Sequence, residues 1–177
     1  MNFSIIQVES LPEPNFNKEC KFICLSPIAV SSIRERLKPK KIVHANPAED
    51  YSEDEYANLE KHYLDYMNLK EREPFIKNMQ KNLINKFQTY YNKDYPACEH
   101  DFKFSFDINY ITKRQGKISK LIHFKKISKN VTTKIKAFEA PFEITADPDL
   151  SKIGYDTGFG NDNSAGLGCV GFFKDDS

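Results

Sequence analysis

Positive charge gathers in one stretch of the chain that has no acidic residue. Between residues 108 and 138 there is no Asp or Glu, and nine cationic side chains occur: Lys113, Arg114, Lys117, Lys120, Lys125, Lys126, Lys129, Lys134 and Lys136. Because the formal net charge of the whole chain is only +1, the remaining residues carry a charge of −8. Such segregation predicts a surface for a polyanion, and a solvated lysine-rich hairpin is the alternative.

Glycine is concentrated in a second stretch, near the C-terminus. Six of the seven glycines lie between residues 154 and 171. Glycine accepts positive φ, and such backbone can bring its N–H groups close to phosphate oxygens. The candidates for this contact are Gly158, Gly160, Asn163, Ser164, Gly166 and Gly168. Phe159 has the chemistry to stack on a base, although a packing role is more common for such a residue.

One apparent motif in this stretch is accidental. The residues from Gly166 to Gly171 match the G-x-G-x-x-G pattern of dinucleotide-binding proteins. That pattern needs a following helix and an acidic residue about twenty positions later. Only six residues follow Gly171, so no dinucleotide site is predicted.

The four cysteines do not predict a metal site. Cys20 and Cys24 fall on an expected strand, where four residues span roughly 13 Å, too far apart for one tetrahedral zinc. Cys98 and His100 have no further ligands nearby in the sequence. We expect free thiols, no metal and no cofactor. The chain shows no secretion signal and no apolar run of membrane-spanning length, so a cytoplasmic protein without membrane contact is expected.

Hydrophobic periodicity predicts the elements that position these residues. Strands are expected at 3–8 and at 22–30, the latter interrupted at Ser26-Pro27. Helical spacing is expected over 56–67, and a clearer helix over 74–91 has Pro74 in its first turn. Alternation predicts a strand over 102–110, and after a turn the basic run 117–127 forms another. A strand over 133–145 switches parity after Ala137, which predicts a bulge. A helix capped by Asp147 and a strand over 167–173 follow.

These elements predict an α+β fold. With the first strand and the basic strand set aside, the order is βαββαβ, which is the ferredoxin-like arrangement with an antiparallel sheet. The extra elements are an N-terminal strand and a basic β-hairpin. A chain of 177 residues with 40% hydrophobic residues can bury a core large enough for one domain.

The chain resembles the CRISPR-associated endoribonucleases of the repeat-associated RNA-binding superfamily. The glycine-rich segment 153–170 resembles the C-terminal loop of that family, and 25–30 (Leu-Ser-Pro-Ile-Ala-Val) resembles the strand that opens its second ferredoxin-like domain. Members of the family usually have two such domains, with the catalytic histidine in the first. We therefore expect residues 1–15 to be the last strand of a preceding domain, residues 20–177 to be the RNA-binding domain, and the chain to be a C-terminal half.

The resemblance implies a function in CRISPR RNA processing. The intact protein is expected to bind repeat RNA and cut it without a metal, by attack of a ribose 2′-hydroxyl that leaves a cyclic phosphate. Six of the nine cations, together with the glycine-rich loop, would hold the RNA: Lys113, Arg114, Lys117, Lys120, Lys125 and Lys126. Other proteins of a CRISPR effector complex, or a second copy of the chain, are further expected partners. The alternatives are a non-catalytic RNA-binding remnant or scaffold, and an unrelated ferredoxin-like protein that binds a small ligand.

The general base cannot be assigned from the family pattern. The four histidines are His44, His62, His100 and His123. His titrates in the range that proton transfer at neutral pH requires. Only His123 lies within the basic stretch, two residues before Lys125, so it is the one catalytic candidate, with RNA contact or a structural role as the alternatives.

Overall fold

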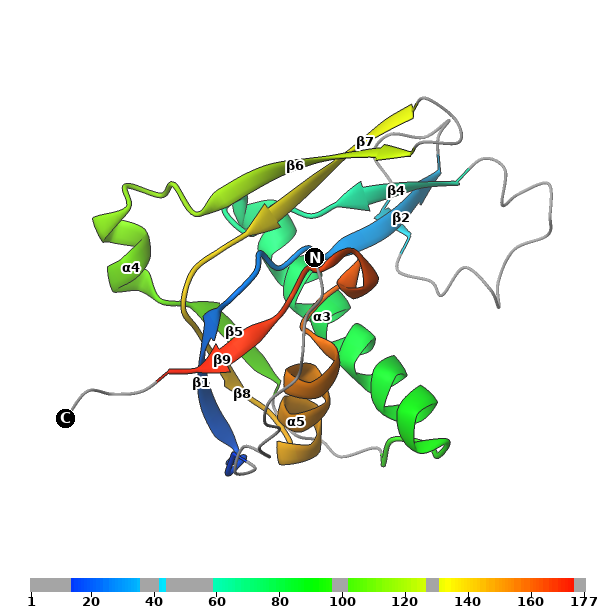
Figure 1. Ribbon diagram of the computed structural model, residues 1–177, viewed down its shortest axis with the longest axis vertical. Helices are drawn as coiled ribbons and strands as arrows, with labels where there is room; N and C mark the ends of the chain where they lie inside the picture. Colours follow the sequence, from blue (N-terminus) through cyan, green and yellow to red (C-terminus); the bar gives the residue numbers. More distant parts are fainter. Residues whose placement is uncertain (1–13, 36–41, 44–58, 97–101, 127–130, 174–177) are drawn as a thin grey trace, which may run out of the picture.

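The main sheet and two helices form a ferredoxin-like core. The computed structural model describes residues 14–35, 42–43, 59–96, 102–126 and 131–173 (Figure 1). The sheet has the strand order β5-β8-β1-β9, with every neighbouring pair antiparallel. Its strands are β1 (Glu19–Cys24), β5 (Lys103–Phe106), β8 (Phe142–Thr145) and β9 (Val170–Phe172). Helices α3 (Leu69–Tyr91) and α5 (Pro148–Thr157) complete the order βαββαβ, so the predicted fold class is confirmed.

Alternating aromatic residues hold the sheet to the helices. In β5 and β8 every second side chain is buried, beginning with Phe104 and Phe142. The centroids of these two rings lie 5.0 Å apart, and the ring centroid of Phe22 in β1 lies 5.4 Å from that of Phe142. The helices contribute the opposite half of this core, with Phe75, Met79, Leu83 and Phe87 from α3 and Leu150 and Ile153 from α5. Burial of these large apolar groups is the main stabilising term of the domain.

Helix α3 begins earlier than the sequence predicts. Asn68 is its N-cap, since the Asn68 Oδ1 accepts from the N–H of Lys70 at 3.0 Å. Pro74 therefore lies inside the helix rather than in its first turn. The helical periodicity of residues 74–91 predicts that Tyr90 shares the buried face of Phe75 and Phe87, but Tyr90 is 65% exposed. An asparagine cap outweighs the proline signal because it satisfies an otherwise unpaired backbone donor.

The predicted strand over 102–110 ends halfway. Strand β5 stops at Phe106, and Asp107 caps the short helix α4 (Ile108–Lys113). The Asp107 Oδ1 accepts from the N–H of Tyr110 at 2.8 Å. Apolar alternation continues through Tyr110 by chance, and periodicity does not register the capping bond that ends the strand.

A second sheet replaces the helix that was predicted over 56–67. It has the order β3-β2-β4, with β2 (Ser31–Glu35), β3 (Ile42–Val43) and β4 (Leu59–Tyr63). The helical prediction is wrong because residues 59–63 pair antiparallel with β2, for example His62 with Ser32. Helical spacing of a few aromatic residues cannot outweigh a ladder of backbone hydrogen bonds with a strand distant in sequence.

Within the basic stretch, β6 (Ser119–Lys126) pairs antiparallel with β7 (Val131–Phe138), and we call this pair the basic hairpin. The bulge expected in a strand over 133–145 is wrong. The chain leaves the hairpin after Phe138 and enters the main sheet at Phe142, so the parity switch marks a break between two sheets. Figure 1 shows the hairpin and the second sheet together at one end of the molecule.

Two predicted features near the chain ends have different outcomes. Asp147 does cap α5, with its Oδ1 accepting from the N–H of Asp149 at 2.8 Å. The strand predicted over 3–8 falls in residues 1–13, outside the described residues. Among the helices in the described part of the chain, none is long and apolar enough to cross a membrane.

Candidate nucleic-acid interface

The basic hairpin and the glycine-rich loop, residues 158–168, share a small hydrophobic cluster. Leu167 of the loop is buried against Ile135 and Ala137 of β7 and against Ala29. The half-buried residues Tyr63, Ile122 and Phe124 pack against the same cluster. Leu167 and the two β7 residues, thirty or more positions apart in the sequence, are therefore neighbours in the structure.

The strand register divides the hairpin into two faces. Ile122 lies opposite Ile135, and this pair points into the cluster. The pairs on either side of it along the hairpin are Leu121 with Lys136 and His123 with Lys134. Because successive residues of a strand point to opposite sides, these two pairs form the outer face. That face therefore presents an imidazole, an alkyl side chain and two ammonium groups.

The outer face is accessible to a ligand. Leu121 is 59% exposed, and His123 and Lys134 are exposed as well. Lys136 is half-buried and forms an ion pair with Asp65, just beyond β4. Lys120, which the register assigns to the opposite face, is exposed and lies 3.7 Å from Glu139. The free positive charge of the hairpin is thus smaller than the count of lysines suggests.

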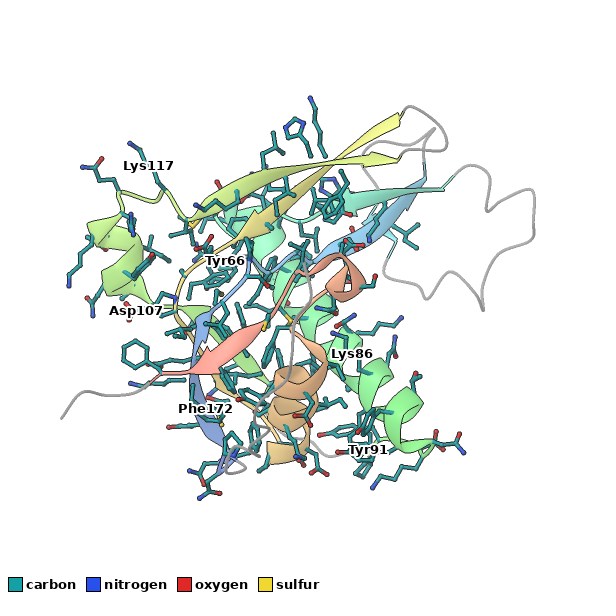
Figure 2. The ribbon with its side chains drawn as sticks, viewed as in Figure 1. Tyr66, Lys86, Tyr91, Asp107, Lys117 and Phe172 are labelled. Atoms are coloured by element: carbon teal, nitrogen blue, oxygen red, sulfur yellow. The ribbon has the colours of Figure 1, made fainter. Side chains whose placement is uncertain are left out.

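The structure does not bring all predicted cations together. Lys113 and Arg114 lie at the end of α4, where the guanidinium of Arg114 lies 5.4 Å from the ring centroid of Tyr110. Lys117 follows at the same end of the molecule, well separated from the glycine-rich loop (Figure 2). All three are exposed. The side chains of Lys125, Lys126 and Lys129 fall outside the described residues.

Three predicted loop glycines have a structural explanation. Gly158, Gly160 and Gly168 are buried and have positive φ. A Cβ at Gly160 would overlap the carbonyl oxygen of Ala29, and one at Gly168 would overlap that of Phe159. These close approaches require glycine whether or not RNA is bound. Phe159 itself is fully buried in the core, so it does not stack on a base.

The remaining loop candidates are more accessible. Ser164 and Gly166 are exposed, and the position of a Cβ at Gly166 has no neighbouring atom within 4 Å. Asn163 is half-buried, and its amide bonds to the loop itself. RNA contact by these three residues stays a prediction, and Ser164 and Gly166 have the geometry for it.

A polar cluster that the sequence does not reveal ties the loop to the second sheet. Asp162 accepts from the Lys61 ammonium at 2.6 Å and from the Tyr63 hydroxyl at 2.8 Å. Burial raises the pKa of Tyr63, and the hydrogen bond to the Asp162 carboxylate raises it further. Because Lys61 and Tyr63 were expected in a helix, only the observed strand places them beside the loop.

The histidines lie in different surroundings. His123 is exposed on the outer face, directly opposite Lys134. His62 lies in β4, half-buried, with its Nε2 3.5 Å from the Glu71 Oε1. His44 and His100 fall outside the described residues. The structure therefore places one histidine among the cations of the hairpin, as the sequence suggested.

Of the described cysteines, Cys20 and Cys24 act as packing groups, whereas Cys169 is exposed. The Cys24 thiol donates to the Ala140 carbonyl at 3.0 Å, and burial raises its pKa to about 12. The buried Cys20 thiol donates to the Asn17 carbonyl at 3.2 Å. Across the described residues, no group of three or more His, Cys, Asp or Glu side chains is arranged to hold a metal ion.

Comparisons with known proteins support one family. The model of the family described as CRISPR associated protein Cas6, C-terminal, matches residues 67–172. The curated CRISPR-associated endoribonuclease Cas6 1 of Methanocaldococcus jannaschii is 30% identical over 96 residues, which are 54% of this chain and 32% of that protein.

Solved structures share the fold. A CRISPR associated protein Cas6 superposes with a TM-score of 0.56 at 25% identity, covering 93% of this chain and 52% of that one. A Cas6-related protein from Pyrococcus furiosus gives a TM-score of 0.59 at 18% identity over 97% and 54%. A protein described as a RAMP protein binding different RNA substrates gives 0.57 at 19% identity over 96% and 52%. The chain spans about half the length of these structures and about a third of the curated relative.

Proposed function

The chain belongs to the CRISPR-associated Cas6 family, and on this premise we propose that it binds CRISPR repeat RNA. The surface we assign is formed by hairpin β6–β7 and the glycine-rich loop, residues 158–168. The observation that carries the proposal is the cluster in which Leu167 of the loop packs against Ile135 and Ala137 of the hairpin. This packing fixes a shaped backbone segment beside an array of exposed cations.

The two elements contribute differently to RNA binding. Exposed lysines such as Lys120 and Lys134 bind phosphates without regard to sequence, and that attraction weakens as salt rises. On the outer face, Leu121 and His123 lie beside the cations and offer apolar and stacking contacts to unpaired bases. A single-stranded or hairpin-containing RNA fits this combination, because its unpaired bases are accessible.

We extend the proposal to the reaction of the intact protein. Cleavage would proceed by attack of the ribose 2′-oxygen on the adjacent phosphorus, which breaks the bond to the 5′-oxygen and leaves a 2′,3′-cyclic phosphate. The step needs a base for the 2′-hydroxyl proton, an acid for the leaving 5′-oxygen, and cations for the developing charge. His123 is our candidate for a proton-transfer role, with Lys134 directly opposite to stabilise charge. In this proposal residues 1–15 belong to a preceding domain and residues 20–177 form the RNA-binding domain.

A binding titration tests the surface. Replacing Lys120, Lys125 and Lys126 together by Ala should weaken affinity for a labelled repeat RNA and reduce its dependence on salt, since phosphate contacts are lost. The matched control is Lys77→Ala on α3, whose side chain is 67% exposed but far from the hairpin in sequence. Equal affinity of the triple variant and the control at physiological salt would refute the assigned surface.

A product assay separates an enzyme from a scaffold. The chain is incubated with repeat RNA in the presence of a chelator, and the ends of the products are identified. Cyclic-phosphate ends that His123→Ala abolishes would support catalysis with His123 in a proton-transfer role. RNA that is bound but stays intact favours the non-catalytic scaffold. Competition by free nucleotides as effective as competition by RNA would instead indicate a small-ligand protein.

A further inference from the structure

The ammonium of Lys86 is bonded to three oxygens of the glycine-rich loop. It donates to the Gly158 carbonyl at 2.5 Å, to the Gly160 carbonyl at 2.9 Å and to the Asn163 Oδ1 at 2.7 Å. A protonated lysine has three N–H groups, so these bonds use all of them. Lys86 belongs to α3, and Figure 2 shows it on the part of the helix beside the loop.

Asn163 extends this contact across the loop. While its Oδ1 accepts from Lys86, its Nδ2 donates to the Leu167 carbonyl at 2.8 Å and to the Phe159 carbonyl at 3.3 Å. These two carbonyls lie on opposite limbs of the loop, and a direct bond from Phe159 N–H to the Gly168 carbonyl at 2.8 Å joins the limbs again. One lysine therefore reaches both limbs, directly or through one amide.

The far side of the same loop is attached to the start of the second sheet. The Asn161 N–H donates to the Ala29 carbonyl at 2.7 Å, and the Asn161 Oδ1 accepts from the Ser31 N–H at 2.9 Å. Lys86 thus holds the loop from the helix layer while Ala29 and Ser31 hold it from the strand layer. The exposed tip, Ser164 to Gly166, follows directly after these attachments in the sequence.

The surroundings of Lys86 suit an ammonium that stays within the protein. Burial lowers the pKa of Lys86 to about 8, because desolvation penalises the charged form. At neutral pH the group is still mainly protonated, and carbonyl oxygens solvate it in place of water. With every donor already bonded to the protein, Lys86 has no N–H left for a phosphate.

We propose that Lys86 is the positioning residue of the glycine-rich loop, setting the shape in which that loop meets RNA without touching RNA itself. The expected effect of Lys86 on RNA affinity rests on the proposed RNA-binding function. Its effect on the shape of the loop does not. Neither the lysine pattern nor the glycine pattern of the sequence points to Lys86, which lies within helix α3. The contact with RNA would come instead from the exposed loop tip and from the hairpin.

The test compares Lys86→Met with the control Lys77→Met, an exposed position on the same helix. Methionine keeps an unbranched side chain but removes all three donors. In Lys86→Met, amide hydrogen exchange should speed up at least about tenfold at Phe159, Asn161 and Gly168, while the amides of β1 and β8 keep their protection. RNA affinity should fall about tenfold with an unchanged slope of log affinity against log salt, because no phosphate contact is removed. The control should change neither quantity.

The outcomes separate this proposal from others. Unchanged loop exchange in Lys86→Met overturns the positioning role. A smaller salt slope overturns it as well, since that would show direct phosphate contact. Faster exchange throughout β1 and β8 would indicate a general packing role and also count against it. If Lys86→Met does not fold, Asn163→Ala is tested in its place. This variant removes the amide that connects Lys86 to the Leu167 carbonyl, so the same backbone amides should exchange faster.

Failure of the underlying function gives a different result. If the unmodified chain shows no affinity for repeat RNA while Lys86→Met still loosens only the loop, then RNA binding is wrong and the positioning of the loop stands.

Discussion

The glycine-rich loop and the basic hairpin share one hydrophobic cluster but use their polar groups in opposite ways. In the loop, the polar groups of Asn161, Asn163 and Gly168 bond to the protein itself. In the hairpin, His123 and Lys134 face solvent from the outer side. This difference indicates that the loop supplies a fixed backbone shape, whereas the hairpin supplies positive charge. Disturbing the loop should therefore cost stability, and disturbing the hairpin should cost affinity.

The largest effect is expected from Gly168→Ala. The position has φ +77°, and a Cβ there would overlap the Phe159 carbonyl oxygen. Backbone strain together with overpacking should lower the free energy of unfolding by about 3 kcal/mol. Urea denaturation measures the change. The control is Gly166→Ala, with φ +83° but open space, for which about 1 kcal/mol is expected. Equal losses at the two positions would show that close packing does not define the loop.

A second, smaller effect concerns charge on the hairpin. The double variant Lys120→Ala and Lys134→Ala should lower the slope of log affinity against log salt by about 2, one for each phosphate contact. Stability should change little, because the exposed pair of Lys120 with Glu139 contributes weakly. Fluorescence anisotropy at several salt concentrations measures the slope. A slope equal to that of the unmodified chain would remove the hairpin from the RNA surface.

A third change addresses the junction between the two regions. Tyr63→Phe removes the hydroxyl that donates to Asp162 and should lower the unfolding free energy by about 1 kcal/mol. The folded-state pKa of Tyr63 is raised, so its stabilising contribution is complete below pH 10 and is lost as the pH rises above that value. Thermal unfolding between pH 8 and 11 should show this loss in the unmodified chain and less of it in Tyr63→Phe. Parallel pH profiles would contradict the assigned bond.

The smallest effect on stability should come from Leu121→Ser. Leu121 is 59% exposed on the outer face of the hairpin, so the free energy of unfolding should stay within about 0.5 kcal/mol of the original value. If bases contact this face, affinity for single-stranded RNA should fall more than affinity for a perfect duplex of the same length. A matched loss for both RNAs would limit the hairpin to phosphate contacts.

Much of the core was predictable from the sequence because its signals are local. The spacing of Phe75, Met79 and Leu83 repeats with the helical period, and all three are buried. Asp147 followed by Pro148 marks the start of α5 by capping chemistry alone. Two wrong predictions, the start of α3 and the end of β5, came from the local caps Asn68 and Asp107, and in the others a distant partner decided the structure. Residues 59–63 became a strand because β2 lies beside them, and β7 separated from β8 because each pairs with a different sheet.

The candidate site was predictable in outline only. Charge counting identified the hairpin, and glycine counting identified the loop. Neither count shows that Lys136 is paired with Asp65, or that Phe159 points into the core instead of toward a ligand. Lys61 and Lys86 were not recognised, because their partners Asp162 and Asn163 lie more than seventy residues away.

By itself the sequence determined which elements and local features this protein has. These are an α+β core with ferredoxin-like order, an acid-free stretch of cations, and a glycine-rich segment before the last strand. Composition and periodicity are properties of neighbouring residues, so they can be read without coordinates. The tertiary structure alone decided that the hairpin and the glycine-rich loop meet at the cluster around Leu167, and that the cations near α4 lie elsewhere. The reason is physical, since strand pairing and the packing of a shared cluster depend on contacts between segments that the sequence separates.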